Sequence, residues 1–249
     1  MTAEAELIFG INPVLAVLAD RARPVETLLL QQGGRNPRLR EVERLAGERA
    51  VRPRFVERMV LDRLCLGAVH QGVALRVGVR VQPSWEMLLE RLAGMEEAVL
   101  LLLDGIEDPR NLGAILRVAE AFGVMAVVLP RDRSAPLSSV AVKASAGAAE
   151  QIDTVRVTNL ARAIQELQLY GVRVFGLDGE SPVRLDDGLK GWHGLVALVL
   201  GGEGKGLRRL TRERCDAVLA IPMVGAVGSL NVATAGAIAL YELRRRHGC

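Results

Sequence analysis

From residue 98 onward the sequence alternates short apolar runs with segments of helical periodicity, and this alternation constrains the fold more than any other feature. A strand with a helix layer on each face has no side exposed to water, so its sequence is apolar throughout. Apolar strands that alternate with helices are typical of an α/β fold, with a mostly parallel sheet and helices on both faces. The predicted strands are Ala98–Leu103, Ala126–Leu129, Thr154–Val157, Arg173–Leu177, Leu195–Leu200 and Ala217–Ile221. The predicted helices are Leu112–Phe122, Ser138–Ala149, Leu160–Leu169, Leu207–Cys215 and Asn231–Arg246.

The first 80 residues show a separate pattern of shorter alternating elements. Pro83 and Ser84 then punctuate the chain before a predicted helix at Trp85–Leu92. We therefore predict a small α/β domain at residues 1–80, a linker with a short helix at 81–97, and the larger α/β domain at 98–249. In the first part, the predicted helices are Pro13–Asp20, Asn36–Arg49 and Val56–Leu66, and the predicted strands are Glu26–Leu30 and Val73–Val79.

Cysteine and histidine usage argues against disulfide and metal chemistry. The three cysteines, Cys65, Cys215 and Cys249, are an odd number and contain no Cys-x-x-Cys pair. No two of the three histidines are spaced as His-x-x-x-His. The start of the chain also lacks the basic and apolar regions of a signal peptide. We therefore expect a protein without a metal site in the reducing cytoplasm.

Positive charge is concentrated in the first 80 residues, which hold 13 Lys and Arg against 9 Asp and Glu in a chain of net charge +3. Eight of these arginines lie between Arg35 and Arg58. Such a cluster can contact the phosphates of a nucleic acid, but the solvated surface of an arginine-rich protein explains it equally well. Composition leaves both interpretations open.

Ligands of open α/β sheets bind beyond the carboxyl ends of the strands, so function is expected in the loops that follow the predicted strands. The first loop, residues 104–113, leads into a predicted helix with one apolar face. Arg117 lies about 160° around the helix axis from the centre of that face. Arg117 is therefore not predicted in the core, and a solvated helical arginine is the simplest explanation from the residues alone. Helix capping similarly explains Asn111.

The second loop, Gly201–Gly206, places glycines around Glu203. It matches neither the dinucleotide fingerprint nor the phosphate-binding P-loop. A tight turn explains its glycines, which would also let backbone amides approach a ligand closely.

The third loop lies within Val218–Tyr241, a stretch with no charged residue that is long enough to suggest a membrane span on length alone. Its glycines, its proline and its polar residues argue against a lipid-facing helix, so we expect it to be buried or to line a ligand. Ser229 and Asn231 would then be buried polar groups that need partners. Helix capping accounts for only one of the two.

Three motifs in these loops, taken in this order, resemble those of the SpoU (TrmH) branch of the SPOUT RNA methyltransferases. They are Asn-x-Gly-x-x-x-Arg from Asn111, Gly-Gly-Glu-Gly-x-Gly from Gly201, and Ile-Pro-Met-x-Gly-x-x-x-Ser-Leu-Asn-Val from Ile221. The resemblance spans the entire chain and is greatest to members that methylate a guanosine of 23S ribosomal RNA. The other similar stretches are residues 67–72, 130–135, 156–162 and 208–213.

The resemblance implies transfer of a methyl group from S-adenosylmethionine (SAM) to a ribose 2′-hydroxyl of RNA, without a metal. It assigns the easing of the hydroxyl proton to Arg117. Because a guanidinium ordinarily stays protonated, we expect Arg117 to stabilise developing alkoxide charge, and a role as base stays open. The residues implied to shape the RNA side of the site are Asn111, Glu203, Ser229 and Asn231. The residues whose backbone is implied to hold SAM are Gly201, Ile221 and Leu230.

The resemblance also implies a C-terminal trefoil knot and a homodimer with each site near the subunit interface, which would cover Arg117. It implies that the first domain binds the RNA substrate. Aromatic residues make up only 3% of the chain, so we expect RNA shape to matter more than base stacking, with Phe55 as the main stacking candidate. For His70, a contact to RNA and a structural role are both open.

Three alternatives differ in how well the sequence supports them. A transfer RNA ribose 2′-O-methyltransferase shares the three motifs, but the extra first domain argues against its shorter forms. A non-catalytic RNA-binding relative is disfavoured because all five polar residues implied in the site are present. A nucleotide-dependent dehydrogenase lacks the required glycine fingerprint. The modified nucleotide stays open, as does the choice between naked ribosomal RNA and a large-subunit assembly intermediate as the substrate.

Overall fold

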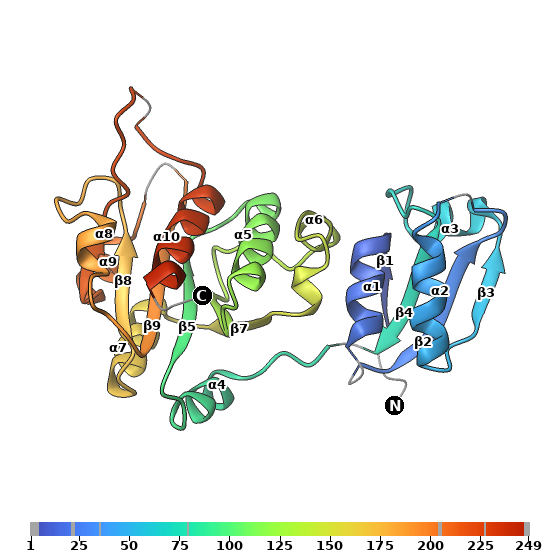
Figure 1. Cartoon of the computed structure of the whole chain (residues 1–249), viewed down its shortest axis with the longest axis horizontal. Helices are drawn as coiled ribbons and strands as arrows, with labels where there is room; N and C mark the ends of the chain where they lie inside the picture. The colour runs from blue at the N-terminus through green and yellow to red at the C-terminus, as the bar shows by residue number, and fades with distance from the viewer. Residues whose placement is uncertain are drawn as a thin grey trace. The chain divides into compact units, whose positions relative to one another are not determined.

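The computed structural model of this 249-residue chain describes residues 5–20, 23–34, 36–78, 80–203, 206–226 and 228–246 (Figure 1). The chain divides into two compact units. The first comprises residues Met1–Val81 and Ala146–Gln151, and the second comprises Gln82–Ser145 and Ile152–Cys249. No helix within the described ranges is long and apolar enough to cross a membrane.

The first unit is built on a four-stranded sheet with helices on both faces. The strands, in spatial order, are β1 (Ala5–Phe9), β4 (Val73–Gly78), β2 (Val25–Gln31) and β3 (Pro53–Val56). Strand β4 is antiparallel to both neighbours, whereas β3 is parallel to β2. Leu28 and Leu30 pack against α1 (Ile11–Ala19) and α2 (Leu39–Glu48), while Leu29 faces α3 (Arg58–Leu64).

The second unit contains a six-stranded sheet in which every pair of neighbouring strands is parallel. Its strands, in spatial order, are β10 (Ala217–Leu219), β8 (Arg173–Leu177), β9 (Leu195–Gly201), β5 (Ala98–Asp104), β6 (Ala126–Pro130) and β7 (Asp153–Val157). From β5, the chain adds β6 and then β7 on one side of the sheet. Strands β8, β9 and β10 lie on the other side, so the direction of strand order reverses beside β5 and β9.

Helices cover both faces of this sheet. On one face, α4 (Trp85–Leu92) and α7 (Leu160–Leu169) bury leucines against alternate residues of the strands. On the other, α5 (Pro109–Ala121) and α10 (Val232–Arg246) lie next to each other (Figure 1). The second unit also contains α6 (Ser139–Ala144), α8 (Leu185–Gly188) and α9 (Arg209–Arg214), whereas the 3₁₀ turn η1 (Ala148–Glu150) belongs to the first unit. The prediction of a mostly parallel sheet covered on both faces is confirmed.

The structure corrects several predicted elements. Strands β1 and β3 and helix α8 were not predicted. The predicted helix Val56–Leu66 begins only at Arg58, because Val56 pairs with Gln31 at the end of β3. The predicted helix Ser138–Ala149 is interrupted after Ala144, because residues 146 and 147 have φ angles of 53° and 103°. The trefoil knot stays a prediction.

Candidate functional site

The carboxyl ends of β5 and β9 lie side by side, with Asp104 in register with Gly201. The chain then turns tightly, because the amide of Gly202 donates to the carbonyl of Asp104 (2.9 Å) and the amide of Gly206 donates to that of Gly202 (3.1 Å). A Cβ atom on Gly201 would lie 2.2 Å from the carbonyl carbon of Gly206, and one on Gly202 would lie 2.4 Å from the carbonyl oxygen of Gly105. Close backbone packing therefore explains why Gly201 and Gly202 are glycines.

Asp104, at the end of β5, connects the first loop to the segment that follows the second loop. Its side chain is buried, and its Oδ2 atom accepts a hydrogen bond from the amide of Arg208 (2.8 Å). The Nε atom of Arg208 lies 3.6 Å from the other carboxylate oxygen. Asp104 thus holds the segment that leads into α9 against the turn that follows β5.

The side chain of Asn111 connects all three loops. Its Nδ2 atom donates to Oε1 of Glu203 in the second loop, and its Oδ1 atom accepts from Nδ2 of Asn231 in the third (3.0 Å). The cap of α5 is Asp108, whose Oδ1 accepts from the amide of Arg110 (2.8 Å), so helix capping is the wrong explanation for Asn111. Three segments far apart in sequence therefore meet at one carboxamide.

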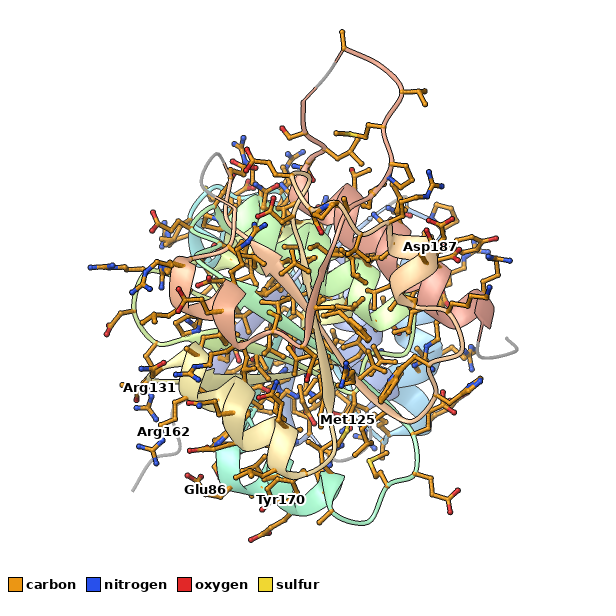
Figure 2. The ribbon with its side chains drawn as sticks, turned by 90° about the vertical axis from the view of Figure 1, so that its left-hand side faces the viewer. Glu86, Met125, Arg131, Arg162, Tyr170 and Asp187 are labelled. Carbon is orange, nitrogen blue, oxygen red and sulfur yellow. The ribbon has the colours of Figure 1, made fainter. Side chains whose placement is uncertain are left out.

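Asn231 caps α10, because its Oδ1 atom accepts from the amides of Ala233 (2.9 Å) and Thr234 (3.4 Å). The expectation that Ser229 and Asn231 are buried is wrong, since both are exposed. The described residues between β10 and α10 project away from the rest of the second unit in both views (Figures 1 and 2), and Val224 is fully exposed. Asn231 satisfies its polar groups at the helix start rather than in a core.

The other residues of the predicted site lie outside this hydrogen-bonded cluster. Arg117 is exposed on α5, about 9 Å along the helix axis and about 120° around it from Asn111. Ile221 is half-buried just beyond β10, and Leu230, next to Asn231, is 38% exposed. Within this one chain, the cluster is thus assembled from Asn111, Glu203 and Asn231.

Arg156 is a residue whose role the sequence did not show. It donates to the carbonyls of Pro130 (3.1 Å) and Ala135 (2.9 Å) and to Oγ of Ser134 (2.6 Å). Burial lowers the pKa of this guanidinium. The amide of Ala135 in turn donates to the carbonyl of Ile106 (2.7 Å) in the first loop. Arg156 therefore holds the β6–α6 connection beside the site, and its place in the similar stretch 156–162 was its sequence signal.

Further cations lie along the same edge of the sheet. Arg131 directly follows β6, and Arg162 lies in the first turn of α7. Both side chains project outward into solvent (Figure 2), although Arg162 also pairs with Glu166 (2.8 Å). Exposed arginines at this edge of the sheet suit an anionic ligand.

His70 has a structural role in the first unit. Its Nδ1 atom accepts from the amide of Gly72 (3.0 Å), and its Nε2 atom lies 2.9 Å from Oδ1 of Asp62. The ring is buried. Because both ring nitrogens have partners within the fold, the structural interpretation of this histidine is favoured over a contact to RNA.

The comparisons with known proteins agree with this geometry. Residues 98–241 match the SpoU rRNA Methylase family, and residues 7–78 match the family described as RNA 2′-O ribose methyltransferase substrate binding. The chain therefore belongs to the SpoU rRNA methylase family. The site at the ends of β5 and β9 lies within the methylase match.

Individual relatives resemble the whole chain. It is 44% identical, over 100% of both chains, to the 23S rRNA (guanosine-2′-O-)-methyltransferase RlmB of Xanthomonas campestris. It is 41% identical to RlmB of Escherichia coli, over 97% of this chain and 99% of that one. Among solved structures, the AdoMet-bound rRNA methyltransferase from Sinorhizobium meliloti superposes with a TM-score of 0.77 at 25% identity, covering 97% of this chain and 87% of the other.

Proposed function

We propose that this protein transfers a methyl group from SAM to the ribose 2′-hydroxyl of a guanosine in 23S ribosomal RNA, in the cytoplasm. The observation that carries the proposal is the hydrogen-bonded series Glu203–Asn111–Asn231, which joins one residue from each of the three motifs. The activity named for the full-length relatives supports the choice of ribosomal RNA over transfer RNA.

The residues around this cluster fit SAM. Backbone groups of Gly201, Ile221 and Leu230 would hold it, beside a loop whose side chains are apolar at Met223 and Leu230 and therefore suit an adenine ring. When bound, SAM would supply a methyl group on a positively charged sulfonium. The sulfur departs as a neutral thioether, so its departure needs no Lewis acid. Across the described ranges, no three His, Cys, Asp or Glu side chains are grouped so as to hold a metal ion.

The protein's own task is to place the hydroxyl and stabilise its charge. In-line attack requires the reacting atoms to be held within about 3–3.5 Å. Asn111, Glu203, Ser229 and Asn231 would orient the ribose through their amide, carboxylate and hydroxyl groups. Arg117 would stabilise the alkoxide that develops as the hydroxyl loses its proton to solvent or to a nearby RNA phosphate.

The position of Arg117 favours a homodimer as the active form. In one chain, Arg117 points away from the Asn111 cluster by about a third of a helical turn. A second copy packed over the exposed side of α5 would cover Arg117 and bring it to the partner's site. Each site would then draw on both subunits.

Incubation of the purified protein with tritiated SAM and three separate RNAs tests this function. We expect label in protein-free 23S ribosomal RNA or in immature large subunits, and none in bulk transfer RNA. Label confined to transfer RNA would favour the alternative substrate. Tight SAM binding without label in any RNA would contradict the proposed transfer.

A further inference from the structure

A hollow of about 460 Å³ opens in the first unit between α2 and the edge strand β3. Phe55 of β3 is in register with Leu30 of β2, so its ring faces the α2 side of the sheet. Because β3 is the outermost strand, the ring is covered from one side only, and Phe55 remains 59% exposed. Pockets of this volume accommodate small organic groups.

The lining combines an apolar floor with a polar rim. Leu30 and Leu39 form the floor, and both are buried. The rim residues are Gln31, Asn36, Arg40 and Glu43. The Oδ1 atom of Asn36 accepts from the amide of Arg38 (3.0 Å), which leaves its Nδ2 group as the donor toward a ligand. The hollow thus offers an aromatic face together with donors and acceptors around it.

We propose that this hollow, the Phe55 pocket, binds an unpaired base of the RNA substrate, stacked on the Phe55 ring. This proposal rests on the proposed function, since it takes RNA as the substrate. A base is flat and apolar on its faces and carries hydrogen-bonding groups on its edge, which matches the floor and the rim. A base within a helix is already stacked on both faces, so only an unpaired one can enter.

Charge determines which part of a nucleotide the pocket accepts. The carboxylate of Glu43 repels a phosphate but accepts hydrogen bonds from the N–H groups of a base. Arg40, on the same rim, would bind the adjoining phosphate instead. The surrounding segment carries the arginine cluster that begins at Arg35 and ends at Arg58, which suits a polyanion better than an apolar peptide.

The test compares Phe55→Ala with Phe55→Tyr and with Met59→Ala in the full-length protein. Met59 is a matched control, because it is 64% exposed in the same unit but lies on α3, across the sheet from the pocket. Affinity is measured without SAM, by the fluorescence anisotropy of a labelled hairpin with a loop of unpaired bases and of a fully paired duplex. We expect Phe55→Ala to weaken binding of the hairpin about 10-fold, as loss of one base–aromatic stack does, and to leave the duplex unchanged.

Phe55→Tyr and Met59→Ala are expected to bind the hairpin as the wild type does. A second measurement uses 5-iodouridine in the loop, which should cross-link to Phe55 on irradiation. Unchanged hairpin affinity in Phe55→Ala, equal losses for hairpin and duplex, or a cross-link mapped outside the pocket would overturn the proposal. Because binding is measured without methyl transfer, a protein that binds the hairpin through Phe55 but methylates no RNA would contradict the proposed function alone.

Discussion

At the scale of single residues, Asn111 carries an amide group that donates and a carbonyl oxygen that accepts, and each makes one hydrogen bond within the cluster. Aspartate at this position would lose the donor and face the carboxylate of Glu203, while a leucine would satisfy neither partner. The chemistry of the side chain therefore explains why the first motif carries asparagine. Its partners lie 92 and 120 positions away, so its role as a connection follows only from the fold.

Substitution of Arg117 by alanine tests the electrostatic role proposed for it. We expect methyl transfer to fall at least 100-fold, which is the usual effect of removing one group that stabilises an oxyanion. The affinity for SAM, measured by calorimetry, should stay within about twofold, because backbone groups elsewhere hold the cofactor. Arg110→Ala is the control, since Arg110 is also exposed on the same helix. Equal losses of SAM binding and turnover would show that Arg117 is structural.

Cys215 is expected to be an unreactive thiol. Burial raises its pKa to about 12, from an ordinary value of 9.0, and the thiol donates to the carbonyl of Thr211 (3.2 Å). Below pH 9 the folded protein should therefore hold about a thousandfold less thiolate at this position than the unfolded chain. Because the folded pKa is the higher one, the associated stability is present below pH 9 and is lost as pH rises toward 12.

Alkylation at pH 8 checks this expectation. Iodoacetamide labelling of the Cys215 peptide, followed by mass spectrometry, should be far slower in native buffer than in concentrated urea. Similar rates in the two solutions would contradict a half-buried, protonated thiol.

At the scale of secondary-structure elements, the close approach of α5 to α6 depends on Gly113. A Cβ atom there would lie 2.3 Å from the carbonyl oxygen of Ala141 and 2.6 Å from Cβ of Ala144. We expect Gly113→Ala to destabilise the second unit by about 1–3 kcal/mol, because the two helices would have to separate. Methyl transfer should fall as well, since α5 carries Asn111.

Gly47→Ala is expected to change stability in the opposite direction. Gly47 lies within α2, and a Cβ atom there would meet no other atom within 4 Å. Alanine should stabilise the first unit by up to about 1 kcal/mol through its higher helix propensity. Thermal unfolding followed by circular dichroism measures both changes. A stabilised Gly113→Ala variant would contradict the tight contact between α5 and α6.

Helices and strands were predictable from the sequence where they are buried, because burial requires a clear pattern of apolar residues. Helices Trp85–Leu92 and Leu160–Leu169 have the predicted bounds, and the six apolar runs are the six strands of the parallel sheet. Strands β1 and β3 lie at the edges of the other sheet and are mostly exposed or half-buried, so they lack an apolar signature. The break after Ala144 was missed although Ser145 and Gly147 favour turns, because the alanines around them continue the helical pattern.

The site was predictable to a smaller extent. The three motifs indicated one site, and the contacts of Asn111 join the three loops. The exposure of Ser229 and Asn231 was not predictable, because an uncharged segment normally indicates burial. Here the chain between β10 and α10 leaves the sheet, and sequence composition does not show where a loop projects.

At the scale of the whole molecule, the proposed homodimer predicts complementation between two inactive variants. Arg117→Ala and Asn111→Ala should each be inactive alone. In an equimolar mixture after subunit exchange, half of the dimers are mixed, and each mixed dimer has one site with both residues intact if Arg117 acts across the interface. We therefore expect about a quarter of the wild-type activity, measured as tritium transfer. No recovery, with exchange verified by native mass spectrometry, would place Arg117 at its own subunit's site.

The proposed activity requires that the Asn111 cluster forms one methyl-transfer site for ribosomal RNA. The most direct test is to map 2′-O-methyl groups in 23S ribosomal RNA from cells that lack this protein, with either the wild-type gene or the Asn111→Ala variant restored. We predict that one guanosine loses its 2′-O-methyl group without the protein, regains it with the wild type and does not regain it with the variant. An unchanged methylation map in the deletion strain, or full restoration by Asn111→Ala, would contradict the account.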